Sequence, residues 1–150
     1  MQLNTKCFGE IEIDEKGIIT FPEGIPGFED VKKFVMLGST EENSPFQWLQ
    51  SVDNTDLAFV VIDPKHFKPD YVVDVNDADI AVLDIHNVDK VLVLTVVVIP
   101  EDITKMTTNL RAPVLINTEN NRGKQVIQEN GEYQIRHFIM EELRKIGGKK

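Results

Sequence analysis

The stretch Val91-Leu92-Val93-Leu94-Thr95-Val96-Val97-Val98-Ile99 is the longest apolar run of this 150-residue chain and decides its fold class. It is about half as long as the roughly 20 residues that a membrane-spanning helix needs. Most of its residues are β-branched, and such side chains pack well on the pleated surface of a strand. We therefore expect a buried β-strand here and no membrane span.

Short segments in which apolar and polar residues alternate flank this run on both sides, as is typical of strands with one buried face. We expect one hairpin between residues 10–14 and 18–21, turning at Lys16-Gly17, and a second between residues 46–51 and 57–62. Further strands are predicted at residues 35–37, 80–83, 114–116, 123–127 and 133–136, the last two joined by a turn at Asn130-Gly131.

Helical spacing occurs in few places. Residues 28–34 fit a short helix or turn, residues 77–83 fit a short helix as an alternative to the strand, and residues 101–106 fit one helical turn. The one long helical pattern places Phe138, Leu143 and Ile146 among charged residues and ends at Gly147-Gly148. Because many short strands occur without alternating long helices, we expect an all-β, mainly antiparallel sandwich or barrel with a few short helices and a C-terminal helix.

Charge restricts the class of partner. The chain has 25 acidic and 16 basic side chains and a formal net charge of −9, which repels a phosphate backbone. We therefore expect no direct nucleic-acid binding.

The single cysteine, Cys7, cannot form an internal disulfide, and the first residues lack the apolar stretch of a secretory signal. These features predict a cytoplasmic protein.

The residue patterns of the common catalytic and metal sites are not found. The three histidines lie far apart in the sequence and lack the spacing of a zinc site. The segment from Asp74 to Asp79 resembles the start of a calcium loop, but Ala78 stands at its fifth position and Asp79 at its sixth, where glycine is needed. No glycine-rich phosphate loop or nucleophile elbow is found either. We expect no catalytic residue, no metal and no cofactor.

The segment Thr108-Asn109-Leu110-Arg111-Ala112-Pro113-Val114-Leu115-Ile116-Asn117 places a polar cluster directly before an apolar strand. Pro113 biases Ala112 away from helix, so a turn should present Asn109 and Arg111 sideways to a partner. The alternative is that Asn109 bonds to its own backbone in the turn and that Arg111 is a solvated charge.

Two further groups are candidates for contact with a partner protein. Phe46, Trp48 and Tyr71 lie near turns, where aromatic side chains commonly hold partners, although each could equally belong to the core. Asp74, Asp77 and Asp79 belong to an acidic stretch from Asp70 to Asp89, which could steer a basic partner or form an ordinary solvated face.

Several motifs follow one another along the chain. The first is residues 19–29, Ile-Thr-Phe-Pro-Glu-Gly-Ile-Pro-Gly-Phe-Glu, and the second is residues 45–51, Pro-Phe-Gln-Trp-Leu-Gln-Ser. They are followed in order by Ala58-Phe59, Pro69-Asp70-Tyr71, residues 108–113 with Ile116-Asn117, and residues 123–127. Taken together, these residues resemble the flagellar assembly factor FliW family over nearly the whole chain, to about His137.

The resemblance implies a non-enzymatic, β-barrel-like protein with two alternative partners, the RNA-binding translational repressor CsrA and newly made flagellin. Capture of the repressor would relieve repression of flagellin translation, and flagellin would then compete for the factor. It also implies a barrel domain over residues 1–138, followed by a tail over residues 139–150 that the pattern allows to be helical. Two other classes stay open: a small-ligand-binding β-barrel and a hydrolase with a carboxylate site.

Overall fold

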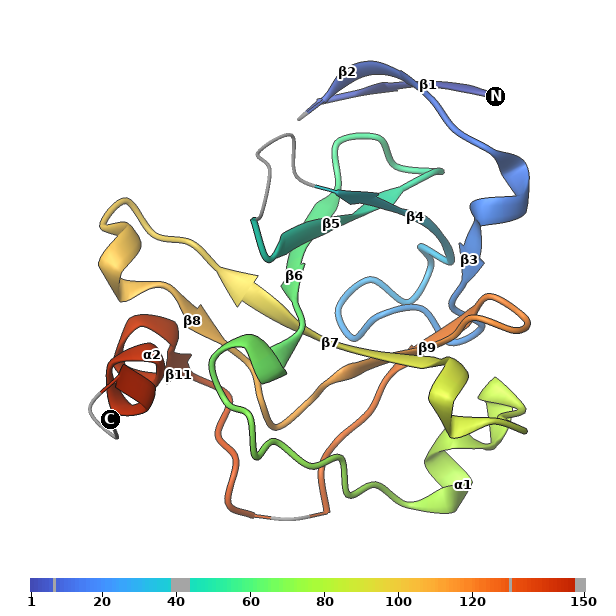
Figure 1. Ribbon diagram of the computed structural model, residues 1–150. Coiled ribbons are helices and arrows are strands. Elements are labelled where there is room, and N and C mark those ends of the chain that lie inside the picture. The colour runs from blue at the N-terminus through green and yellow to red at the C-terminus, as the bar shows by residue number, and fades with distance from the viewer. Residues whose placement is uncertain (7, 39–43, 130, 148–150) are drawn as a thin grey trace.

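Seven strands close into a β-barrel, which Figure 1 shows in the computed structural model. The structure describes residues 1–6, 8–38, 44–129 and 131–147. Around the barrel, the order of strands is β7 (Val91–Val98), β6 (Ala58–Ile62), β5 (Phe46–Ser51), β4 (Lys33–Gly38), β3 (Ile19–Thr20), β10 (Arg122–Gln125) and β9 (Val114–Asn117), which pairs with β7 again. Among these described strands all pairs are antiparallel except β3 with β10. The all-β, mainly antiparallel prediction is confirmed.

The strand predicted from the apolar run, β7, is the longest strand and organises the sheet. One edge of β7 pairs with β6, whereas the other edge pairs with β9 in its first half and with β8 (Thr107–Thr108) at its end. Residues 109–113 lie between β8 and β9 and stand opposite only Thr95 and Val96, so they form a bulge. Because of this bulge the sheet divides: β9 closes the barrel, and β8 continues into β11 (His137–Phe138) outside it.

Two hydrophobic cores hold these parts together. Large side chains fill the barrel interior, and the buried members of this first core include Phe21, Phe34, Leu49, Val61 and Val114. The second core lies where β8 and β11 leave the barrel, and its buried members are Ile62, Phe67, Tyr71, Val97, Leu110, Tyr133 and Ile139. A packed interior is what a seven-stranded barrel requires, since a barrel of this size has just enough room for its side chains.

The remaining elements cover the barrel from outside (Figure 1). The hairpin of β1 (Gln2–Thr5) and β2 (Gly9–Glu12) packs through Leu3 against Val35 of β4. The helices are η1 (Glu15–Gly17), η2 (Pro64–His66), α1 (Asp77–Ile80), η3 (Ala81–Leu83), η4 (Val88–Lys90), η5 (Ile103–Lys105) and α2 (Ile139–Gly147). An aspartate or asparagine side chain caps η1, η2, α1, η4 and η5 by accepting a backbone N–H bond.

Several predicted elements are confirmed. The hairpin of residues 46–51 with 57–62 forms as β5 and β6, and residues 101–106 contain the single turn η5. The C-terminal helix forms as α2, although Gly148 lies outside the described residues. Residues 28–32 form turns rather than a helix, and β4 begins at Lys33.

Three strand predictions are wrong. Residues 10–14 and 18–21 do not pair, because β2 pairs with β1 while β3 pairs with β4 and β10. Residues 77–83 form α1 and η3, the helical alternative, because Asn76 caps their first turn. Residues 133–136 are not a strand and β10 pairs elsewhere, so the predicted hairpin is absent from the described chain; Asn130 itself, like Cys7, lies outside it.

Candidate protein-interaction site

Asn109 and Arg111 lie in the bulge between β8 and β9. The side-chain oxygen of Asn109 accepts the backbone N–H groups of Arg111 and Ala112, each at 3.1 Å. The alternative interpretation of the sequence is therefore confirmed for Asn109, whose side chain supports its own turn. The side chain of Arg111 is exposed, while its carbonyl oxygen accepts the N–H of Gln128 at 2.7 Å. Contact of Arg111 with a partner stays a prediction.

A buried polar network ties this bulge to the segment that follows η2. The hydroxyl of Tyr71 donates to the carbonyl oxygen of Leu110 at 2.6 Å and accepts from Gln128 Nε2 at 2.9 Å. Burial raises the pKa of Tyr71 to about 12, so the hydroxyl keeps its proton and stays a donor. Tyr71 is only 4% exposed, so a partner would meet it only through the residues that it positions.

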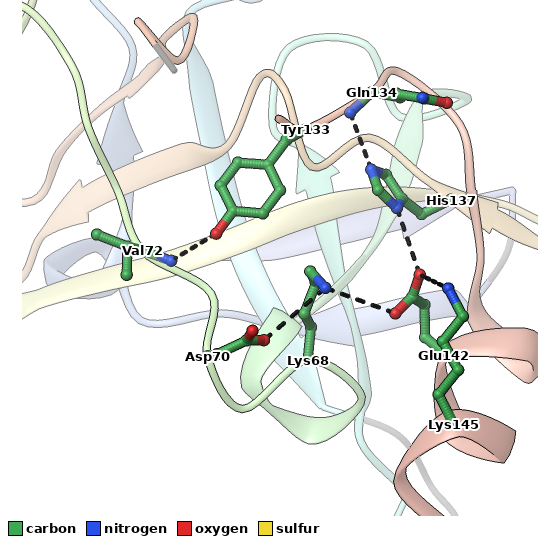
Figure 2. Close-up of polar contacts among 8 residues, drawn as sticks. All are labelled: Lys68, Asp70, Val72, Tyr133, Gln134, His137, Glu142 and Lys145. Carbon is green, nitrogen blue, oxygen red and sulfur yellow. Dashed lines mark hydrogen bonds and ion pairs between the residues drawn. The ribbon is translucent and has the colours of Figure 1, made fainter. Parts of the chain in front are cut away.

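The same network fixes the acidic segment, by which we mean the exposed Asp74, Asp77 and Asp79 and the backbone that joins them. Gln128 Oε1 accepts the N–H of Asp74 at 2.6 Å, and the hydroxyl of Tyr133 accepts the N–H of Val72 at 3.1 Å (Figure 2). These bonds hold the start of the segment on the barrel. The three predicted carboxylates therefore stand together on one fixed stretch and face solvent.

Phe46 and Trp48 lie on one face of β5, because residues two apart in a strand point to the same side. Both side chains are half-buried. The ring of Trp48 meets Phe8 edge-on with centroids 5.5 Å apart, and Phe46 packs against the second core. Each aromatic ring thus has partners within the chain and still presents part of its surface.

A cluster of charges that the sequence did not predict joins α2 to β11 and to the segment after η2 (Figure 2). Glu142 is 8% exposed and lies 3.7 Å from Lys68 Nζ, 3.5 Å from His137 Nδ1 and 3.4 Å from Lys145 Nζ. Glu142 and the fully packed Ile139 are three residues apart and share one helix face. That spacing was the available signal, but the helical pattern noted in the sequence was that of Phe138, Leu143 and Ile146, which are 43%, 42% and 37% exposed.

The hydrogen bonds of this cluster set its protonation. His137 Nε2 accepts the N–H of Gln134 at 2.8 Å, so the proton of a neutral ring is on Nδ1, facing Glu142. Burial lowers the pKa of His137; Glu142 acts to raise it, the ammonium groups of Lys68 and Lys145 act to lower it, and the net pKa is lowered. Burial acts to raise the pKa of Glu142, but the same two ammonium groups outweigh it, and the net pKa is lowered. The cluster is thus an ion-paired support for α2.

A hollow of about 770 Å³ beside the first half of β7 is relevant to the two alternative classes. Its lining includes Met36, Gln47 and Leu92, and Asp63 is the one carboxylate among the described residues that line it. Asp63 is already bonded to the N–H of Lys65 as the cap of η2. A hydrolase that works with a pair of carboxylates, as glycosidases do, needs two of them to converge, and the described lining does not supply them.

Two further features are absent from the described residues. These residues contain no group of three histidine, cysteine or carboxylate side chains that could hold a metal ion. They also contain no helix long and apolar enough to cross a membrane.

Comparison with known proteins places the chain among its relatives. The family described as FliW protein matches residues 2–139. Two proteins named Flagellar assembly factor FliW, from Thermoanaerobacter pseudethanolicus and Caldanaerobacter subterraneus subsp. tengcongensis, are 51% and 52% identical over 144 residues, 96% of this chain and 96% of each relative. The crystal structure of a flagellar assembly factor FliW matches with a TM-score of 0.85 at 37% identity, covering 93% of this chain and 96% of that one. The sequence identity to these relatives and the similarity of the barrel to that structure show that the chain belongs to the FliW family of flagellar assembly factors.

Proposed function

We propose that this protein is a non-enzymatic partner switch in flagellar assembly. It binds a CsrA-type RNA-binding repressor and so relieves repression of flagellin translation, and newly made flagellin competes for it. Family membership carries this proposal, because the relatives described above are named flagellar assembly factors. No cofactor takes part in either binding step.

The acidic segment supports the half of the switch that concerns the repressor. A repressor that binds RNA must present cationic side chains to phosphates, and exposed carboxylates attract such a surface during encounter. The net charge of −9 then repels RNA from the complex even where the protein does not cover the RNA site. Phe46, Trp48 and Arg111 are further proposed contacts with a partner.

In this proposal Tyr71 and Asn109 position the partner surface and do not form it. Both side chains are bonded internally, to Leu110 and to the turn of residues 109–112, and they set where the acidic segment and Arg111 stand. The proposal also includes a barrel domain over residues 1–138 and a helical tail over residues 139–150. We place the switch in the cytoplasm, where messenger RNA is repressed and flagellin is made.

A gel-shift experiment tests the proposal. Repressor is bound to flagellin leader RNA at physiological salt, and the protein is then added. We expect the RNA to be released, and we expect the protein alone to shift no RNA. An RNA shift by the protein alone, or a repressor–RNA complex that persists at saturating protein, would refute the proposal.

A matched pair of variants tests the part played by the acidic segment. Both triple variants raise the net charge by the same amount, and all six aspartates are exposed: D74N/D77N/D79N in the segment and D30N/D53N/D56N elsewhere. We expect the first variant to slow association with the repressor several-fold at low salt, and the second to leave the rate near wild type. Equal rates would show that steering depends on total charge alone.

A further inference from the structure

The sheet extension of β7, β8 and β11 has two faces of opposite character. Paired residues across neighbouring strands point to the same face. One face is turned to the second core and α2, and it carries Val97, Thr108 and His137, which are paired in register. Val98, Thr107 and Phe138 are paired on the opposite face, where Val98 is 63% and Phe138 is 43% exposed. A solvent face of an antiparallel sheet is normally polar, so this row of apolar side chains requires an explanation.

This outer face forms one wall of a groove of about 600 Å³. The opposite wall is the loop at Ile25 and Pro26 with Phe59 of β6, and Ile135, which is 63% exposed, adds a further apolar side chain. β7 pairs with β8 only beyond the bulge at residues 109–113, and β8 lies outside the barrel, at the left of Figure 1. The result is an open apolar channel between the extension and the end of the barrel.

The charge of the groove is opposite to that of the protein. Although the chain has 25 acidic side chains, the ionisable residues among the described lining are Lys105 and Arg136, both exposed and both cationic. Neither forms an ion pair with a carboxylate of the described residues. An apolar channel lined by two cations matches an apolar segment that carries anionic side chains.

We propose that this groove is the docking site for an apolar segment of a partner protein that has carboxylate side chains beside its apolar residues. The inference rests on the proposed function, and of its two partners flagellin is the occupant. A filament subunit held before assembly has its apolar contact segments uncovered, and a groove of this kind covers them. The cationic surface of an RNA-binding repressor is repelled by Lys105 and Arg136.

The groove and the acidic segment are both supported by the second core. Val97 and Ile139 come from the extension and α2, while Tyr71 and Tyr133 hold the acidic segment, and all four belong to the second core. If a partner bound in the groove displaces a residue of this core, the residues that hold the acidic segment move as well, and the reverse holds for a partner bound at the acidic segment. Competition between the two partners therefore does not require that they touch the same residues.

The test measures binding of purified flagellin monomer to the full chain and to three variants. Val98→Glu places a carboxylate in the groove, and Lys105→Glu reverses one of its cations. Val88→Glu is the matched control, since Val88 is 78% exposed and does not line the groove. Because all three side chains are exposed, we expect melting curves by circular dichroism to stay near wild type.

We expect both groove variants to weaken flagellin binding at least about tenfold and the control to change it less than about twofold. If wild type binds flagellin and all variants bind equally well, the groove is not the docking site, while the proposed function stands. If Val98→Glu instead abolishes self-association seen by sedimentation, a second copy occupies the groove and the inference is wrong. If wild type binds no flagellin, the proposed function fails and this inference fails with it.

Discussion

Substitution of Tyr71 by phenylalanine separates a supporting role from direct contact with a partner. The change keeps the ring and removes a hydroxyl that donates to Leu110 and accepts from Gln128, both inside the protein. Gln128 keeps its second acceptor, the carbonyl of Val72, so the main loss is the donor to Leu110. Loss of such a buried bond costs about 1–3 kcal/mol. We therefore expect the free energy of unfolding to fall by about 2 kcal/mol, which lowers Tm by about 4–8 °C in a domain of this size.

Thermal melting followed by circular dichroism measures this effect, with Tyr133→Phe as the comparison. Tyr133 accepts the partly buried N–H of Val72, so its variant should lose about 1 kcal/mol. Below its melting temperature, Tyr71→Phe should bind both partners like wild type, because Tyr71 is 4% exposed. A Tm within about 1 °C of wild type would refute the structural reasoning. A large loss of affinity at unchanged Tm would show that Tyr71 contacts a partner.

Three further predictions concern packing, pH and the partner surface. Gly123→Ala places a Cβ 2.6 Å from the buried ring of Phe21, so the free energy of unfolding in a denaturant melt should fall by about 1–3 kcal/mol. Gly38→Ala is the control, because no atom lies within 4 Å of its Cβ, and its loss should be less than about 1 kcal/mol. The pKa of His137 is lowered from 6.5 and that of Glu142 from 4.5, so the contribution of these two groups to stability is present above those values and is lost as pH falls through each folded pKa. The difference in Tm between wild type and a His137→Gln variant should therefore become less favourable to wild type from about pH 7.5 to about pH 5.5, and a difference that grows in favour of wild type would contradict this sign. Arg111→Ala should weaken binding of at least one partner by more than about 1 kcal/mol in calorimetry, and a smaller loss for both would show that Arg111 is not a hot spot.

Local patterns in the sequence predicted the elements whose partners are close in the chain. The hairpin of β5 and β6 and the apolar strand β7 follow from alternation and β-branching within a few residues. The pairing of β3 with β10 did not follow, since the N–H of Thr20 bonds to the carbonyl of Asn121, about a hundred residues away along the chain. Barrel closure of this kind depends on long-range register, which no short window of sequence contains.

The candidate site divides in the same way. The turn at Asn109 was foreseeable, because asparagine commonly bonds to its own backbone in turns. The apolar face at Val98 and Phe138 was not, because it arises only when two residues far apart in the sequence are paired through Thr107. Burial of Glu142 likewise depends on Lys68, which follows η2 and is far from Glu142 in the sequence.

Displacement of the repressor by flagellin tests the partner switch most directly. The CsrA-type repressor is labelled with a fluorophore, saturated with this protein, and titrated with flagellin monomer while anisotropy is recorded. We expect the anisotropy to return to that of the free repressor as flagellin takes its place. If flagellin binds while the anisotropy stays at the value of the complex, both partners are held together and there is no switch.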